Sequence, residues 1–141
     1  MLESEIIMEK VPHPIPALER KRQVLIVDDN KTVRKAVLRM LVSLGCKVTP
    51  AGNGYEGGIL FLTRSLDLAI IDLNLPQMKV RQLSRIFKTH SPNTPVIVAT
   101  GFSNNKPWRQ VGMNFVDATI PKPFKLDEIE GTVQRLLGNG R

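Results

Sequence analysis

The sequence has few of the residues on which many catalytic and secreted proteins depend: one cysteine, two histidines and one tryptophan in 141 residues. Cys46 cannot form a disulfide within the chain, which favours a reducing compartment. His13 and His90 both stand near prolines, in segments expected to be exposed, and neither is assigned a role. No apolar run approaches the roughly 20 residues of a membrane span, and residues 1–10 lack the apolar centre of a signal peptide. We therefore expect a cytoplasmic protein with no membrane span.

Positive charge is abundant, with 20 basic against 13 acidic residues. Residues 1–22 hold four of each kind, so the whole excess lies in the remainder of the chain. It gathers in two segments, namely Lys31, Arg34, Lys35 and Arg39, and Lys79, Arg81, Arg85 and Lys88. Two solvated helix faces are the simpler interpretation. The alternative is a docking surface for an acidic protein or for nucleic acid, and the latter would reveal itself by steeply salt-dependent binding.

The length suits a single domain preceded by a leader. Pro12, Pro14 and Pro16 alternate with other residues, a pattern that favours an extended arm over a packed element. We place the boundary near Arg20, with a leader over residues 1–20 and a folded domain over 21–141.

Short apolar runs alternate with helical patterns along this domain. Strands are predicted at 24–27, 46–50, 68–72, 96–99 and 118–120, and helices at 31–44, 55–63, up to 89, 107–113 and 126–137. Asn30 is placed to cap the first helix and Gly45 to end it, while Gly57 and Gly58 weaken the second. Five strand-helix units of this kind predict an α/β fold with one parallel sheet.

Charged residues end several of these apolar runs: Asp28 and Asp29 follow the first, Asp72 follows the third, and Lys122 follows the last. The carboxyl ends of parallel strands open into one crevice, so these charges should meet. Three carboxylates a few Å apart repel one another, and a buried lone carboxylate is costly. Lys122 supplies one positive charge, and a hard ion such as Mg²⁺ would satisfy the rest. The pattern predicts a site that handles phosphoryl groups.

Four stretches together resemble the receiver domain of two-component response regulators, over nearly all of residues 23–137. They are Val-Leu-Ile-Val-Asp-Asp-Asn at 24–30, Asp-Leu-Asn-Leu-Pro-Gln-Met at 72–78, Val-Ile-Val-Ala-Thr-Gly at 96–101 and Lys-Pro-Phe at 122–124. The resemblance implies a flavodoxin-like, doubly wound five-stranded parallel sheet of order 2-1-3-4-5 with five helices.

The resemblance also implies a role for each matching residue. Asp72 would accept a phosphoryl group, and Thr100 and Lys122 would each contact a phosphoryl oxygen. Mg²⁺ would be held by Asp28, Asp29, Asp72 and the main-chain carbonyl of Asn74. Each residue also has a simpler interpretation: the two aspartates after the first strand could cap a helix, Thr100 could be a turn residue, and Lys122 a surface lysine.

The chain departs from the family pattern at three positions. Lys79 and Val80 stand where receivers usually have Asp-Gly, which removes a glycine from the loop beside Asp72. Thr119 stands where an aromatic ring commonly swings inward on activation. We expect these departures to alter the usual switch and to leave phosphorylation intact.

Little of the chain remains after Leu137, so we expect a single-domain response regulator whose output is protein contact or phosphorelay. It would be a signalling domain that catalyses at most its own phosphorylation and dephosphorylation. The expected partners are a sensor histidine kinase or phosphotransfer protein and an unknown downstream protein, with nucleic acid disfavoured and the chain a monomer or weak dimer.

Two rival functions are set against this interpretation. A hydrolase of the haloacid-dehalogenase type needs a second acid two residues after the nucleophile, and Asn74 stands there. A pseudo-receiver, a binding module whose output does not depend on phosphorylation, is favoured only by Lys79, Val80 and Thr119.

Overall fold

The computed structural model describes residues 20–75, 80–101 and 115–138, and its elements follow the predicted alternation. The strands are β1 (Arg22–Val27), β2 (Cys46–Ala51), β3 (Leu68–Asp72), β4 (Val96–Thr100) and β5 (Ala118–Pro121). The helices are α2 (Lys31–Ser43), α3 (Gly54–Thr63), α4 (Val80–His90) and α5 (Leu126–Leu137). The predicted helix at 107–113 lies outside the described residues.

All five strands pair in parallel in the order β2-β1-β3-β4-β5, which confirms the predicted doubly wound sheet. Strand β1 lies between β2 and β3, with Val24 opposite Val48 of β2 and opposite Leu68 of β3. The chain reverses its direction of winding after β2, so the carboxyl ends of β1 and β3 lie side by side. This is the point of an open α/β sheet at which ligand crevices form.

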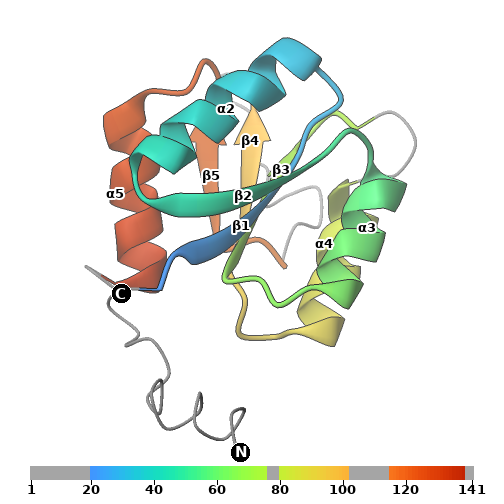
Figure 1. Ribbon diagram of the computed structural model, residues 1–141. Helices are drawn as coiled ribbons and strands as arrows, with labels where there is room; N and C mark the ends of the chain where they lie inside the picture. Colours follow the sequence, from blue (N-terminus) through green and yellow to red (C-terminus); the bar gives the residue numbers. More distant parts are fainter. Residues whose placement is uncertain (1–19, 76–79, 102–114, 139–141) are drawn as a thin grey trace, which may run out of the picture.

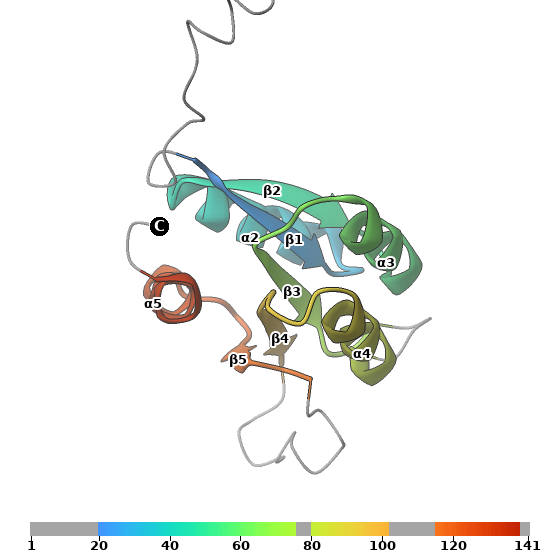
Figure 2. The ribbon, with the colours of Figure 1, turned by 90° about the horizontal axis from the view of Figure 1, so that it is seen from below.

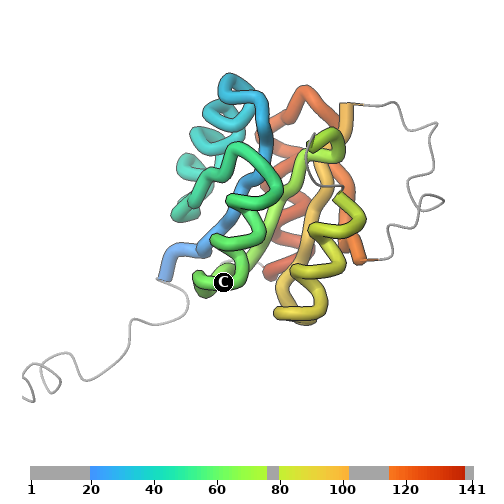
Figure 3. The backbone as a smooth tube through the Cα atoms, turned by 90° about the vertical axis from the view of Figure 1, so that its right-hand side faces the viewer, coloured from blue at the N-terminus to red at the C-terminus, as the bar shows by residue number. Residues whose placement is uncertain are grey.

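Helices cover both faces of the sheet (Figure 1), and alternate residues of β1, β3 and β4 pack in the cores on the two faces. Val24 and Ile26 of β1 pack in the core beneath α2 and α5, while Leu25 and Val27 pack in the core beneath α3 and α4. Seen from the right-hand side of Figure 1, α3 and α4 lie in front of the sheet with α5 behind it (Figure 3). Strands that are buried on both faces explain the nearly continuous apolar runs in the sequence.

The ends of the first two helices follow local capping rules. Asn30 caps α2 by accepting a hydrogen bond from Val33 N at 3.0 Å, and Asn53 caps α3 by accepting one from Glu56 N at 2.8 Å. Gly45 follows α2 with φ +89°, a conformation that favours glycine, and its N–H donates to Val42 O. Both the predicted cap and the predicted stop of α2 are therefore confirmed.

Gly57 in α3 lies directly on the sheet. A Cβ at this position would come within 2.7 Å of Val27 Cγ2, so no larger side chain fits without movement. Sequence reasoning treated Gly57 only as a weakness of the helix, whereas the structure shows that it allows α3 to approach β1 closely. Among the described helices, none is both long enough and apolar enough to span a membrane.

Candidate functional site

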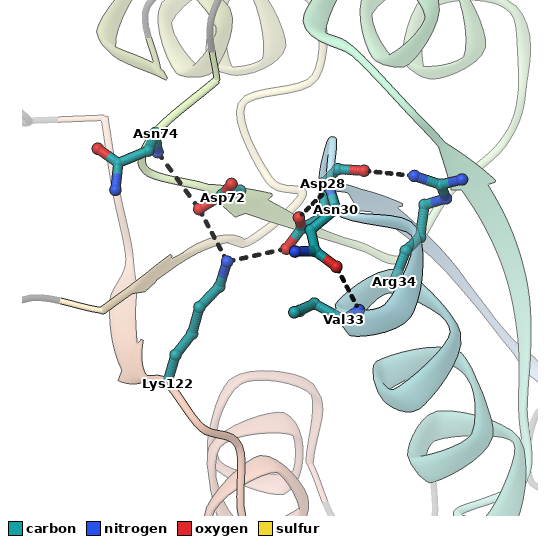
Figure 4. A network of polar contacts seen from close by, with 7 residues as sticks. All are labelled: Asp28, Asn30, Val33, Arg34, Asp72, Asn74 and Lys122. Atoms are coloured by element: carbon teal, nitrogen blue, oxygen red, sulfur yellow. Dashed lines mark hydrogen bonds and ion pairs between the residues drawn. The ribbon is translucent and has the colours of Figure 1, made fainter.

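The site lies where β1, β3 and β5 end, and a single lysine joins its two buried acids (Figure 4). Lys122 Nζ lies 3.0 Å from Asp28 Oδ2 and 3.0 Å from Asp72 Oδ1. In the sequence, Lys122 lies 94 positions after Asp28 and 50 positions after Asp72. Their convergence at the carboxyl edge of the sheet is what the three apolar runs predict.

The electrostatics of this trio are those of a buried ion cluster. Asp28 and Asp72 are 1% and 4% exposed, so both carboxylates depend on neighbours for solvation. Burial by itself would lower the pKa of Lys122, but the hydrogen bonds and charges of Asp28 and Asp72 outweigh it and leave that pKa raised. Lys122 is therefore held firmly as a cation between the two acids.

Asp29 completes an acidic cluster. One carboxylate oxygen from each of Asp28, Asp29 and Asp72 lies within 4.8 Å of the others, and Asp29 is exposed while the other two are buried. Three carboxylates against one ammonium leave a net negative pocket with only oxygen donors. Mg²⁺ prefers this donor set, with one or two carboxylates directly bound and water completing the shell. The residues present therefore fit a magnesium ion.

The turn that carries Asp28 and Asp29 is held by its own hydrogen bonds. Asp28 Oδ1 accepts from Asn30 N at 2.9 Å, and Asp28 N donates to Ala51 O at 3.1 Å. Arg34 reaches back from the first turn of α2, and its Nη1 donates to Asp28 O at 2.7 Å. Sequence reasoning placed Arg34 on a basic exterior face, but it is half-buried and supports the turn. Nothing in the sequence signals this role, because Arg34 is one of several basic residues in the helix.

Thr100 and Asn74 border the same site. Thr100 ends β4, is half-buried, and its carbonyl accepts from Lys122 N at 2.8 Å, so β4 positions the start of the lysine segment. Asn74 is exposed, and its N–H donates to Asp72 Oδ1 at 3.3 Å. The roles assigned to the Thr100 side chain and to the Asn74 carbonyl stay predictions.

Of the three residues that depart from the receiver pattern, the structure describes Val80 and Thr119. Val80 begins α4 and is 2% exposed, packed in the core beneath that helix, whereas Lys79 lies outside the described residues. Thr119 is half-buried in β5 and lines a shallow depression against α5. The altered switch that these positions suggest remains a prediction.

The side chains of the two predicted basic segments are not all exposed to solvent. Lys88 Nζ lies 2.7 Å from Asp117 Oδ2 and donates to Thr94 O at 2.9 Å, so it ties α4 to the starts of β4 and β5. Lys31, Lys35 and Arg39 are exposed along α2, as a solvated helix face requires. On α4, Arg81 and Arg85 are also exposed.

The sequence matches the family model described as "Response regulator receiver domain" over residues 24–134. Among curated proteins it is similar to a probable transcriptional regulator, ycf27, of Cyanidium caldarium, with 31% identity over 120 residues. That alignment covers 84% of this chain but 47% of the relative. The chain thus spans about half the length of that relative, and 22% of a sensor histidine kinase, AtsR, of Burkholderia thailandensis.

Two solved structures extend the similarity to receivers with bound ions. One is the response regulator TrrA of Thermotoga maritima in complex with Mg²⁺ and BeF, with 25% identity, a TM-score of 0.75, and coverage of 82% of this chain and 99% of that one. The other is the receiver domain of the sensor histidine kinase PA1611 of Pseudomonas aeruginosa, with magnesium in its active-site cleft. It has 26% identity, a TM-score of 0.75, and coverage of 85% and 100%.

Proposed function

This chain belongs to the family of response regulator receiver domains, the signalling domains of two-component systems, and from that membership we propose that it accepts a phosphoryl group on Asp72. The donor is a phosphohistidine on a sensor histidine kinase or a phosphotransfer protein. The observation that carries the proposal is the placement of Asp72 at the end of β3, 4% exposed and 3.0 Å from Lys122 Nζ. A buried acid with a cation beside it suits the acceptance of a charged group.

The acidic cluster supports the choice of cofactor. Asp28, Asp29 and Asp72, with the carbonyl of Asn74, would hold Mg²⁺, which supplies positive charge to the phosphoryl oxygens. Two similar proteins of known structure, each about one quarter identical to this chain, support this choice: one is in complex with Mg²⁺ and BeF, and the other has magnesium in its active-site cleft.

The protein's own residues do the remainder of the chemistry. A carboxylate oxygen of Asp72 attacks phosphorus as the phosphorus–nitrogen bond of the phosphohistidine breaks, and the partner's imidazole leaves. Lys122 moves one of its hydrogen bonds from the Asp72 carboxylate to a phosphoryl oxygen, where charge gathers in the transition state. Thr100 donates its hydroxyl to a second phosphoryl oxygen. Arg34 keeps the Asp28–Asp29 turn in place through the carbonyl of Asp28.

The output is proposed to be contact with a downstream protein or transfer of the phosphoryl group onward. Receiver domains interact with histidine kinases and phosphotransfer proteins, and the PA1611 receiver is itself part of a sensor kinase.

Beryllofluoride binding tests this proposal directly. In NMR spectra of the full chain, beryllofluoride with Mg²⁺ should shift amide signals around Asp72 and Lys122 in a saturable, Mg²⁺-dependent way. Asp72→Asn should abolish the response. Asp67→Asn is the matched control, because Asp67 is an exposed aspartate that precedes the same strand at its other end and should leave the response unchanged.

Two results would contradict the proposal. A response of equal size in Asp72→Asn would move the acceptor elsewhere. The absence of any response in the native chain at millimolar Mg²⁺ would indicate a pseudo-receiver whose output does not depend on phosphorylation.

A further inference from the structure

Helix α3 exposes three large apolar side chains along one side. Tyr55, Ile59 and Leu62 are 58%, 63% and 46% exposed. Their spacing of four and then three residues places them on one face of the helix. Glu56 is the only charged residue in α3, and a helix this apolar is normally covered all round.

This apolar face borders α4. Gly58 faces α4, because a Cβ there would lie 3.7 Å from Leu83 Cδ1, and one turn further Phe61 stacks on Phe87 with ring centroids 3.9 Å apart. Ile86 of α4 is 39% exposed and follows Leu83 by three residues. Helices α3 and α4 lie side by side (Figures 2 and 3), and we call the exposed apolar residues Tyr55, Ile59, Leu62 and Ile86 the α3–α4 stripe.

The charges beside the α3–α4 stripe are basic. Exposed Arg64 follows Leu62 by two residues, and exposed Arg85 precedes Ile86. Glu56 lies on another side of α3, where its Oε1 accepts from Gly52 N at 2.8 Å. A second copy paired through this face would bring like charges together, which disfavours it. The surface instead fits a segment that is both apolar and acidic.

We propose that residues 1–9 of this chain bind to the α3–α4 stripe. This segment carries Glu3, Glu5 and Glu9 together with five apolar residues, Met1, Leu2, Ile6, Ile7 and Met8. Residues 1–19 hold four of the chain's 13 acidic residues and one of its 20 basic ones. An acidic apolar segment is thus joined to a strongly basic domain.

The connection is long enough for this contact. Residues 10–19 include the alternating prolines, and in an extended conformation of ~3.1 Å per residue they reach roughly 30 Å. They join the domain at Arg20, close to Gln23, which exchanges two 2.7 Å hydrogen bonds with Asp67. Asp67 lines a cavity of about 270 Å³ with Arg64 and His90, where α3 and α4 end. The segment proposed to reach the α3–α4 stripe therefore joins the domain beside this cavity.

Weak affinity is sufficient for such a contact. A segment tethered by a short linker has an effective concentration on the order of millimolar, so a millimolar dissociation constant already populates the bound form. Leu62 lies in the last turn of α3, at the end of the strands opposite the acidic site, whereas Tyr55 lies in the first turn of α3, toward that site. A partner that uses the α3–α4 stripe must displace residues 1–9, which makes the leader a competitor at that face.

Paramagnetic NMR on the full chain tests the contact. A nitroxide attached at Ser4→Cys should broaden the backbone amides of Ile59, Leu62 and Ile86 until most of their intensity is lost, and should leave the amide of Val42 sharp. Val42 is a matched reference, because it is 52% exposed and lies on α2, on the other face of the sheet. Cys46 is buried, so the native chain should take up no label.

Variants decide between the possible outcomes. Ile59→Glu should restore the lost intensity, Val42→Glu should not, and Glu5→Lys in the labelled leader should restore it without touching the domain. Broadening that is absent, or that survives both Ile59→Glu and Glu5→Lys, would overturn the proposal. So would broadening that appears only when the spin label and the observed amides are on different chains, because that result assigns the face to a second copy.

Discussion

Aspartates stand at both ends of the sheet, and their surroundings differ. At the carboxyl end Asp28 and Asp72 are buried and share the ammonium of Lys122, 3.0 Å from each. At the amino end Asp67 and Asp117 are exposed, and each accepts a 2.7 Å hydrogen bond from the N–H of a neighbouring strand residue, Gln23 and Val96 respectively.

This comparison distinguishes aspartates that stabilise the fold, Asp67 and Asp117, from aspartates that form the site, Asp28 and Asp72. Each amino-end aspartate is satisfied locally and ties two strands together, so its loss should weaken the fold. The carboxyl-end aspartates crowd like charges in a buried place, an arrangement that costs stability and is retained where it serves binding. Three predictions test this contrast, from the largest expected effect to the smallest.

Removing the shared cation should have the largest effect. Lys122→Met leaves Asp28 and Asp72 buried without their ammonium, and breaking a buried ion cluster in this way costs about 3 kcal/mol of unfolding free energy. Urea unfolding with and without Mg²⁺ measures it, and Mg²⁺ should recover more stability in the variant than in the native chain. Lys88→Met is the matched control: its partner Asp117 is 35% exposed, so the loss should stay below about 1 kcal/mol. Equal losses of unfolding free energy in Lys122→Met and Lys88→Met would contradict the proposed difference between the two ends of the sheet.

Removing an amino-end aspartate should have an intermediate effect. Asp117→Ala takes the side-chain acceptor from the N–H of Val96, a fully buried residue, at a cost of about 1–2 kcal/mol. Asp117→Asn keeps an acceptor oxygen and should lose less. Neither variant should change Mg²⁺ binding, which calorimetric titration would check. Weaker Mg²⁺ binding in Asp117→Asn would show that the two ends are coupled.

How well the sequence predicts a feature of this fold or site depends on how many residues carry the pattern for that feature. The parallel strands and the meeting of Asp28, Asp72 and Lys122 were predictable, because buried parallel strands carry continuous apolar runs and their ends share one edge. The strand order was implied by the resemblance to receiver domains. The inward turn of Arg34 was not, because one basic residue in a basic helix gives no sign of its direction. The exposure of Ile59 was equally hidden: α3 is apolar on every side, so its sequence does not tell the covered face from the bare one.

The smallest predicted effect concerns pH, and it again separates the two ends. Burial raises the pKa of the Cys46 thiol at the amino end, whereas acidic neighbours, against the effect of burial, raise the pKa of Lys122 at the carboxyl end. In both cases the folded chain keeps a proton that the unfolded chain releases, so stability falls as pH rises. The fall should begin near the usual thiol value of 9.0 for Cys46 and near 10.5 for Lys122.

Cys46→Ala isolates the first of these contributions. Above about pH 9 its unfolding free energy, measured by urea titration, should decline less with pH than that of the native chain. Above about pH 10.5 both chains should also lose the Lys122 contribution, which remains in both. Parallel curves throughout would mean that the Cys46 thiol ionises equally in the folded and unfolded chains, and that burial at the amino end does not perturb it. A difference that begins near pH 9, below the pH at which Lys122 contributes, would show that each end titrates by its own cause: desolvation at the amino end, and the charge of two buried carboxylates at the carboxyl end.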